Sequence, residues 1–186
     1  MPATVINGYA VKEKILEQIK KETDSIREKY GVVPGLATIL VGNDPGSVSY
    51  VSHKIKAASS LGFRGLQINL PEETTEEKLL SVIDECNRDE SLHGILVQLP
   101  LPAKINEKKV ICAIDPEKDV DCFHPENMGK VVIGTGDERF YPCTPAGIIE
   151  LIKSTGVRLE GADVVIIGRS NIVGKPLANM LLQKKN

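Results

Sequence analysis

The chain has no tryptophan, and aromatic residues make up only 4% of its 186 residues. A protein that stacks nucleic-acid bases needs several rings, so this scarcity argues against such a platform. Positive charge is not concentrated either, because the formal net charge is -2 and no dense block of Lys and Arg occurs. Nucleic acids and anionic membrane surfaces both select for such blocks. The expected partner is therefore a small molecule, with no nucleic acid and no membrane involved.

Several other signals are missing as well. No apolar run is long enough to span a bilayer, and "MPATVINGYA" lacks the charged start and apolar stretch of a signal peptide. We therefore expect a cytoplasmic protein. The four cysteines contain no C-x-x-C pair, and the three histidines do not complete a metal-ligand spacing. We expect structural or incidental roles for these side chains and no metal site.

What is present is a globular composition, 41% hydrophobic and 26% charged, with apolar runs that alternate with amphipathic ones. The expected strands are "LATILV" (36–41), "LQINL" (66–70) and "GILVQL" (94–99). Helices are expected from Val11 toward Gly31, around residues 47–61, over 76–87 and over 107–114. Strands that alternate with helices favour an α/β domain with a mostly parallel sheet.

Local signals give the expected ends and faces of these elements. In the first helix Val11, Ile15 and Ile19 should face inward. Ser47 is expected to cap the second helix and Gly62 to end it. Thr74 or Thr75 should cap the third helix. Between Asp115 and Tyr141 the periodicity fades, with a possible hairpin in "KVVIGTGDERF" (130–140), so the seam between two lobes is expected there.

The last part of the chain predicts a second, incomplete domain. "CTPAGIIELIKSTG" (143–156) is typical of a connecting helix, with Thr144 as its cap and Pro145 in its first turn. An apolar strand in "ADVVIIG" (162–168), a glycine-bearing loop and a helix opened by Pro176 would begin a Rossmann-like nucleotide-binding fold. We expect domains at 1–141 and 142–186. One strand and one helix cannot bury their apolar faces alone, so the second domain is predicted to be C-terminally truncated.

Tyr50 and Lys54 stand four apart on the second helix, so their side chains are neighbours. The stripe that they share borders an apolar side formed by Val48, Val51, Ile55 and Ala58, whereas Lys56 lies on the solvated side. A snorkelling lysine over a packed tyrosine is the alternative to a catalytic pair. Both residues follow the carboxyl end of a strand, where ligands bind in open α/β sheets.

Gln98 and Asp121 are two further candidates. Gln98 sits where the third strand ends, because Pro100 and Pro102 forbid continued pairing. Asp119 and Asp121 alternate in "DPEKDVDCF", so an extended chain would aim both to one side. A carboxylate at Asp121 could accept hydrogen bonds from the N–H groups of a heterocycle. A polar strand end and a solvated acidic turn remain the alternatives.

The loop "GRSNIVGKP" (168–176) does not match G-x-G-x-x-G, because Gly168 and Gly174 are six apart. Its predicted context is a strand before it and a helix after it, where backbone N–H groups favour phosphate. Arg169 could add a charged contact to a nucleotide's extra phosphate. An ordinary strand-to-helix turn with a surface arginine is the alternative.

Four stretches in this order resemble the bifunctional methylenetetrahydrofolate dehydrogenase/methenyltetrahydrofolate cyclohydrolase family, called FolD in bacteria. The stretches are "VGNDPGSVSYVSHKIKAASSLG", "GILVQLPLP", "DPEKDVDCFHPENMG" with "PCTPAGIIELI", and "GRSNIVGKP". The resemblance runs from about Asn7 to the C-terminus. It implies a reduced folate bound between a catalytic first domain and an NADP-binding second domain, and a homodimer of the full-length protein.

The resemblance also implies roles for the candidates. Tyr50 matches the tyrosine that stacks on folate, Lys54 the catalytic lysine, Gln98 the glutamine that bonds it and Asp121 the aspartate that grips the pterin. Gly168, Arg169, Ser170 and Gly174 match the cofactor loop. The implied reactions oxidise 5,10-methylenetetrahydrofolate and hydrolyse the methenyl product to 10-formyltetrahydrofolate, in one-carbon metabolism that serves purine biosynthesis.

Two departures from the family pattern matter. Cys122 stands where the family commonly has glycine, so a turn that requires positive φ there would be strained or differently shaped. The remainder of the nucleotide domain is absent. Two other functions therefore stay open: a folate-binding fragment without turnover, and a two-domain dehydrogenase of a non-folate substrate such as a small keto or amino acid.

Overall fold

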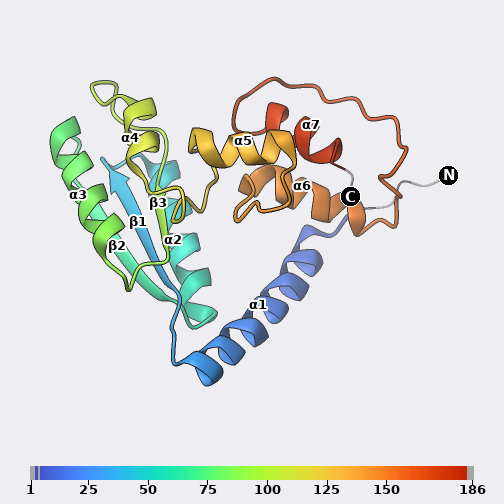
Figure 1. The fold of residues 1–186 in the computed structure, drawn as a ribbon, viewed down its shortest axis with the longest axis horizontal. Helices are drawn as coiled ribbons and strands as arrows, with labels where there is room; N and C mark the ends of the chain where they lie inside the picture. Colours follow the sequence, from blue (N-terminus) through green and yellow to red (C-terminus); the bar gives the residue numbers. More distant parts are fainter. Residues whose placement is uncertain (1–2, 4, 184–186) are drawn as a thin grey trace. The chain divides into compact units, whose positions relative to one another are not determined.

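The structure, a computed structural model, describes residues 3 and 5–183 (Figure 1). Contacts divide these residues into two units, Gln18–Val120 and a second one that combines residues up to Glu17 with those from Asp121 onward. The helices are α1 (Gly8–Tyr30), α2 (Pro45–Ser60), α3 (Glu76–Arg88), α4 (Glu107–Ala113), α5 (Pro125–Ile133), α6 (Cys143–Lys153) and α7 (Gly174–Leu181). The strands are β1 (Gly35–Val41), β2 (Arg64–Leu70) and β3 (Gly94–Val97). The predicted boundary between 141 and 142 stays a prediction.

The unit Gln18–Val120 is built on a parallel sheet in the order β2-β1-β3. Ile39 on the central strand is level with Ile68 on one side and Val97 on the other. Figure 1 shows α2 on one face of this sheet and α3 with α4 on the other. The predicted α/β domain with a parallel sheet is confirmed.

The central strand is buried along almost its whole length because helices cover both of its faces, and its side chains are apolar apart from that of Thr38. Ala37, Ile39 and Val41 point to one face, as the two-residue period of a strand requires. They form one core with buried side chains of α3, β3 and α4, among them Leu79, Ile83, Ile95, Val97 and Val110. Leu40, on the alternate face, is also buried.

Two of the predicted helix ends are confirmed and one is wrong. Thr75 caps α3, with its hydroxyl accepting the N–H of Lys78 at 3.2 Å. Ser60 is the last residue of α2, Leu61 is its C-cap, and Gly62 follows with φ of 85°. The cap of α2 is Asp44 rather than Ser47, because the Asp44 carboxylate accepts the N–H of Ser47 at 2.8 Å. Ser47 therefore lies inside the first turn.

The other unit contains α5, α6 and α7, which surround a second core. Its buried apolar residues are Cys122, Val131, Ile149, Leu177 and Met180. The predicted hairpin at 130–140 is wrong, because residues up to Ile133 belong to α5. Gly134 ends this helix in the left-handed conformation, with φ of 69°. The amphipathic character of "MGKVVI" explains the outcome, since Val131 turns into the core.

The connecting helix forms, but its predicted cap is wrong. The helix α6 begins at Cys143, directly after Pro142, so Thr144 lies within the first turn. Pro145 also lies in this turn, as predicted, and is buried. Its missing N–H costs nothing there, because the first N–H groups of a helix have no intrahelical partner.

The strand predicted at 162–168 does not form, and Figure 1 shows this stretch as a loop between α6 and α7. Val165 is 89% exposed and Ile167 is 100% exposed. A strand needs a neighbour to accept its N–H groups, and no other strand of this unit is present among the described residues. Of the predicted strand, loop and helix, only the loop and the helix are therefore present.

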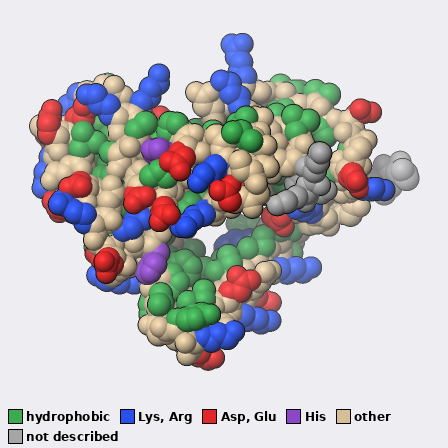
Figure 2. Space-filling model, in the orientation of Figure 1, with side chains coloured by type: hydrophobic (Ala, Val, Ile, Leu, Met, Phe, Trp, Pro, Cys, Tyr) green, Lys and Arg blue, Asp and Glu red, His purple; other side chains and the backbone are tan. Residues whose placement is uncertain are grey.

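The surface carries interspersed charges of both signs on the face drawn in Figure 2. No helix among the described residues is long and apolar enough to cross a membrane. Ile15 of α1 was predicted to face inward but is 37% exposed, so this prediction is wrong. Val48, on the predicted apolar side of α2, is also exposed, at 43%. Val51 and Ala58, further along α2, are buried as predicted.

Candidate active site

Lys54 and Gln98 come together at the carboxyl end of the sheet. Lys54 lies in the third turn of α2, which leaves β1 through a short turn, and its side chain is half-buried. Gln98 is the residue directly after β3. The Lys54 Nζ atom donates to Gln98 Oε1 at 3.2 Å. Two residues that are 44 positions apart thus form a contact where parallel sheets bind their ligands.

The side-chain amide of Gln98 has a fixed orientation. Its Nε2 donates to the carbonyl oxygen of Leu99 at 2.7 Å, and its backbone N–H donates to Ile39 at 2.9 Å. A carbonyl oxygen can only accept, so the amide nitrogen must face Leu99. The amide oxygen is therefore left for Lys54. This arrangement presents the lysine with a neutral acceptor.

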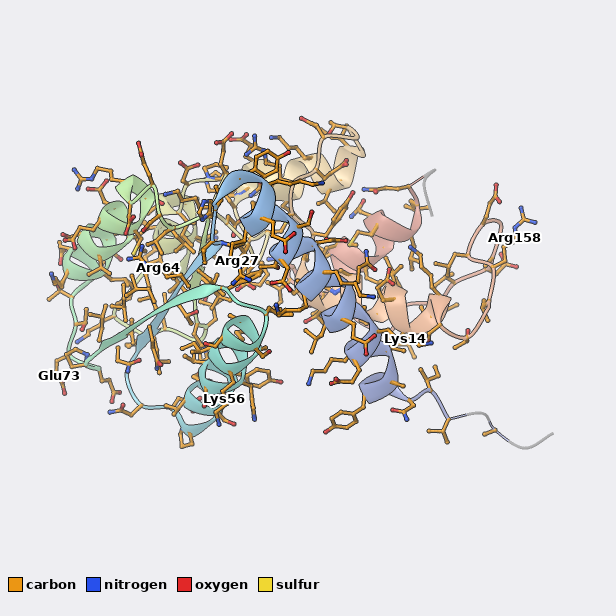
Figure 3. All side chains as sticks on the ribbon, turned by 90° about the horizontal axis from the view of Figure 1, so that it is seen from below. Lys14, Arg27, Lys56, Arg64, Glu73 and Arg158 are labelled. Carbon is orange, nitrogen blue, oxygen red and sulfur yellow. The ribbon has the colours of Figure 1, made fainter. Side chains whose placement is uncertain are left out.

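No carboxylate within the unit Gln18–Val120 forms an ion pair with Lys54. Lys56, two residues further along, is exposed and lies on α2 as labelled in Figure 3. The two lysines of one helix therefore differ as predicted, with Lys56 solvated and Lys54 held by an amide. A freely extended, snorkelling Lys54 does not fit this contact.

Tyr50 precedes Lys54 by one helical turn and is 66% exposed. A tyrosine packed beneath the lysine is therefore ruled out. The exposed ring of Tyr50 lies one helical turn before Lys54, whose amine is hydrogen-bonded to Gln98. A planar ligand could stack on this ring.

Asp119 and Asp121 do not share one environment, contrary to the expectation from their spacing. Asp119 is only 2% exposed and pairs as an isolated parallel bridge with Ile95 of β3. Asp121 is half-buried and belongs to the other unit, where its Oδ1 accepts from the Cys143 thiol at 3.7 Å. The chain turns after Asp121, since Cys122 has φ of 58°.

The glycine-bearing loop is closed by Ser170. Its hydroxyl oxygen accepts the N–H groups of Val173 at 3.1 Å and Gly174 at 3.3 Å, both at the start of α7. A Cβ atom at Gly174 would lie 2.8 Å from the carbonyl of Gly168, so only glycine fits there. Arg169 is exposed beside them. The structure brings these four predicted residues into one turn.

The residues of this turn suit the phosphate groups of a dinucleotide. The Ser170 hydroxyl accepts two hydrogen bonds and keeps its own hydrogen for a phosphate oxygen. Arg169 contributes a positive charge that no carboxylate of the described residues neutralises. The open space around Gly168, where a Cβ would meet nothing within 4 Å, leaves room for a ligand.

Three structural residues of this region were missed by the sequence reasoning. Asp44 fixes the start of the helix that carries Tyr50 and Lys54. Lys118 bonds to the end of α3, and Gly94 leaves room for Val120, so both hold the segment 118–120 before Asp121. The "NDP" sequence at 43–45 is a signal that could have identified Asp44, because an N-cap followed by proline at the first helical position is typical. For Lys118 no local pattern exists, since its partners are distant in sequence.

Two family models match this chain. Residues 6–121 match the tetrahydrofolate dehydrogenase/cyclohydrolase catalytic domain, and residues 142–186 match the NAD(P)-binding domain of the same family. The bifunctional protein FolD of Desulfotalea psychrophila is 56% identical over 184 residues, which are 99% of this chain and 62% of the relative. The FolD of Desulfosudis oleivorans is also 56% identical, over 99% of this chain and 61% of its own length. The chain thus spans about 62% of these curated relatives.

Solved structures give the same result. The bifunctional FolD enzyme of Campylobacter jejuni superimposes with a TM-score of 0.92 at 45% identity, covering 96% of this chain and 63% of that one. The Trypanosoma brucei FolD enzyme, solved with NADP cofactor and an inhibitor, gives 0.93 at 39% identity, covering 97% and 62%. Together with the sheet, the helix that carries Tyr50 and Lys54, and the glycine-bearing loop, these matches show that the chain belongs to the tetrahydrofolate dehydrogenase/cyclohydrolase, or FolD, family.

Proposed function

We propose that this chain carries the folate site of a bifunctional methylenetetrahydrofolate dehydrogenase and methenyltetrahydrofolate cyclohydrolase. The observation that carries the proposal is the contact between Lys54 and Gln98 on family-matched positions. In this function the enzyme oxidises 5,10-methylenetetrahydrofolate to the 5,10-methenyl cation and hydrolyses the cation to 10-formyltetrahydrofolate. NADP, when bound, supplies the nicotinamide that accepts the hydride of the first reaction.

The residues of this chain would bind and orient the folate. The exposed ring of Tyr50 offers a stacking face to the planar part of the substrate. The Asp121 carboxylate would accept hydrogen bonds from the amino and ring N–H groups of the pterin. Arg169, Ser170 and the backbone around Gly168 and Gly174 would hold the dinucleotide phosphates.

Lys54 would position the one-carbon bridge and transfer protons during hydrolysis. Water adds to the methenyl carbon, one carbon–nitrogen bond opens to leave the formyl group on the other nitrogen, and a proton is released. An amine held by a neutral amide suits a cationic intermediate, because no fixed carboxylate at the lysine competes for it. Gln98 accepts a hydrogen bond from either the protonated or the neutral amine, so the lysine stays in place while protons move.

Hydrolysis of the methenyl cation consumes no nicotinamide, so the 186-residue chain can be assayed for it alone. We expect Lys54→Met to reduce the hydrolysis rate by at least about a hundredfold, because the proton-transfer group is removed. Lys56→Met is the matched control, since it removes an exposed lysine of the same helix, and should keep the wild-type rate. Methenyltetrahydrofolate absorbance is the readout, with circular dichroism as a check of folding.

Full hydrolysis by Lys54→Met would overturn the role of this lysine. Calorimetric titration with 5-formyltetrahydrofolate, a stable reduced folate, tests the substrate class independently. If titration of the wild-type chain gave no heat beyond that of diluting the ligand, the folate site itself would be refuted.

A folate-binding chain without hydride transfer is a second candidate, and one observation favours it. The stretch 162–168 has no strand and leaves Ile167 fully exposed, so the nucleotide-binding unit lacks its sheet among the described residues. In this case the 186-residue chain binds 5-formyltetrahydrofolate, while no NADPH absorbance develops with 5,10-methylenetetrahydrofolate and NADP.

Three further features belong to the same proposal. The protein would act in the cytoplasm and form a homodimer. Its product, 10-formyltetrahydrofolate, would donate one-carbon units to purine biosynthesis. The FolD names of the curated relatives support this place in one-carbon metabolism.

A further inference from the structure

The side chain of Lys118 joins its own segment to the end of a distant helix. Its Nζ atom donates to the carbonyl oxygens of Asn87 at 2.6 Å, Asp89 at 2.9 Å and Cys86 at 3.2 Å. These carbonyls lie in the last turn of α3 and just beyond it, where helical carbonyls have no partner within the helix. An ammonium group satisfies them and complements the negative end of the helix.

The backbone at Lys118 is attached as well. Its carbonyl accepts the N–H of Ile95 at 2.7 Å, and Asp119 forms a parallel bridge to Ile95. The segment Lys118–Val120 therefore runs beside β3 in the same direction, toward the carboxyl end of the sheet. Gln98 lies at that end, one residue after β3.

A third attachment comes from Val120. A Cβ atom at Gly94 would lie only 2.4 Å from Val120 Cγ1. Because glycine has no side chain, the Val120 side chain can occupy this space. The segment is thus held by a side-chain tether, by backbone pairing and by a fitted valine. Asp121 is the next residue in the chain.

We propose that Lys118 is a positioning residue for folate binding, which it serves by fixing the segment Lys118–Val120, directly before Asp121. The inference rests on the proposed function, because it takes Asp121 as the carboxylate that binds the pterin. Removing the tether would leave the pairing with Ile95 and the fit of Val120 intact. The chain would still fold, but the Asp121 carboxylate would sample more orientations and would have to be ordered by the ligand.

Binding of 5-formyltetrahydrofolate to the 186-residue chain, measured by calorimetry below the Tm of each variant, tests the inference. We expect Lys118→Met to weaken binding by about tenfold or more. Lys118→Arg should recover most of the affinity, because a guanidinium group also donates to several carbonyls. Lys109→Met is the matched control: it removes another lysine that bonds to α3, through Glu76 at 2.7 Å, but does not touch the segment. Its affinity should equal that of the wild type.

A double-mutant cycle separates positioning from a general loss of stability. If Lys118 acts through Asp121, then Lys118→Met combined with Asp121→Asn should bind no more weakly than Asp121→Asn alone. Gly94→Ala provides a second route, because it displaces Val120 without removing a charge, and should also weaken binding. This variant decides the question if Lys118→Met does not fold.

The possible failures are distinguishable. A wild-type chain that does not bind the folate refutes the proposed function. A wild-type chain that binds, together with unchanged affinity in Lys118→Met and in Gly94→Ala, overturns the positioning role. Additive losses in the double variant also overturn it, because Lys118 would then act independently of Asp121.

Discussion

Cys122 is the only non-glycine residue with positive φ among the described residues, and its side chain is fully buried. The left-handed conformation brings Cβ close to the following carbonyl and costs about 1 to 2 kcal/mol for a residue that has a side chain. The thiol offsets part of this cost by packing in the second core. The turn after Asp121 therefore combines an unfavourable backbone conformation with a favourably packed side chain.

This combination predicts a definite order of stability for two substitutions. Cys122→Gly and Cys122→Ala both lose most of the thiol packing, but only glycine relieves the backbone. We expect Cys122→Gly to have a free energy of unfolding about 1 kcal/mol higher than that of Cys122→Ala. Urea unfolding of the two variants measures the difference. An alanine variant that is equally stable would mean that the conformation at this position is not strained.

At the scale of elements, α2 is the platform of the candidate site, and its position depends on its first turn. Asp44 accepts the N–H of Ser47, and this backbone hydrogen bond, followed by one from the Ser47 hydroxyl, lowers the pKa of the Asp44 carboxyl. The lowered pKa means that folding favours the ionised form. The stabilisation is present above the pKa of the unfolded chain and is lost as the pH falls through the folded value.

The cap therefore predicts a pH-dependent difference between wild type and Asp44→Asn. Asparagine caps helices about as well but carries no charge, so the advantage in Tm of the wild type over Asp44→Asn should fall as the pH drops below the ordinary pKa of an Asp carboxyl, and should stay constant above it. Comparing the two proteins cancels the contributions of other carboxylates. Thermal unfolding on both sides of that pKa gives the measurement, and NMR titration should place the Asp44 midpoint below its usual value. A difference that does not change with pH would contradict the assignment of the cap.

Hydrophobic periodicity predicted most elements of the unit Gln18–Val120, because the packing around β1 leaves an apolar pattern in the sequence. It did not predict the cap at Asp44, since Ser47 and Asp44 carry equally good capping side chains and only the backbone path decides between them. It correctly placed Tyr50 and Lys54 on one helix and Gln98 at a strand end. It could not predict the tether from Lys118 to α3, because about 30 residues separate the partners.

The strand predicted at 162–168 shows a different limit of prediction from sequence, because strand formation depends on neighbours elsewhere in the molecule. Its residues have strong strand propensity, yet propensity alone does not form a strand that has no neighbour to pair with. Val165 and Ile167 are therefore exposed although their side chains are typical of a core. The chain spans about 62% of its curated relatives, so its nucleotide-binding unit contains only part of the family domain.

This exposure predicts that the stretch contributes little to the stability of the 186-residue chain. Ile167→Lys should change the free energy of unfolding by less than about 0.5 kcal/mol, because the side chain is already fully exposed. Ile149→Ala, at a 4% exposed position of the same unit, should cost about 2 to 5 kcal/mol. Hydrogen exchange should show Val164–Ile167 unprotected and Ala37–Leu40 protected. Protection of the former stretch would mean that it pairs in solution.

The second unit is assembled from two stretches of chain, one before residue 18 and one after residue 120. A ribosome that synthesises this protein releases the whole of Gln18–Val120 before the later stretch emerges, and domains generally fold as units during synthesis. The parallel sheet with Lys54 and Gln98 can therefore be complete before α6, which belongs to the same unit as the first turns of α1, has been synthesised. The unit that holds Lys54 and Gln98 would then fold first, and the unit that needs the residues from Asp121 onward would fold after it.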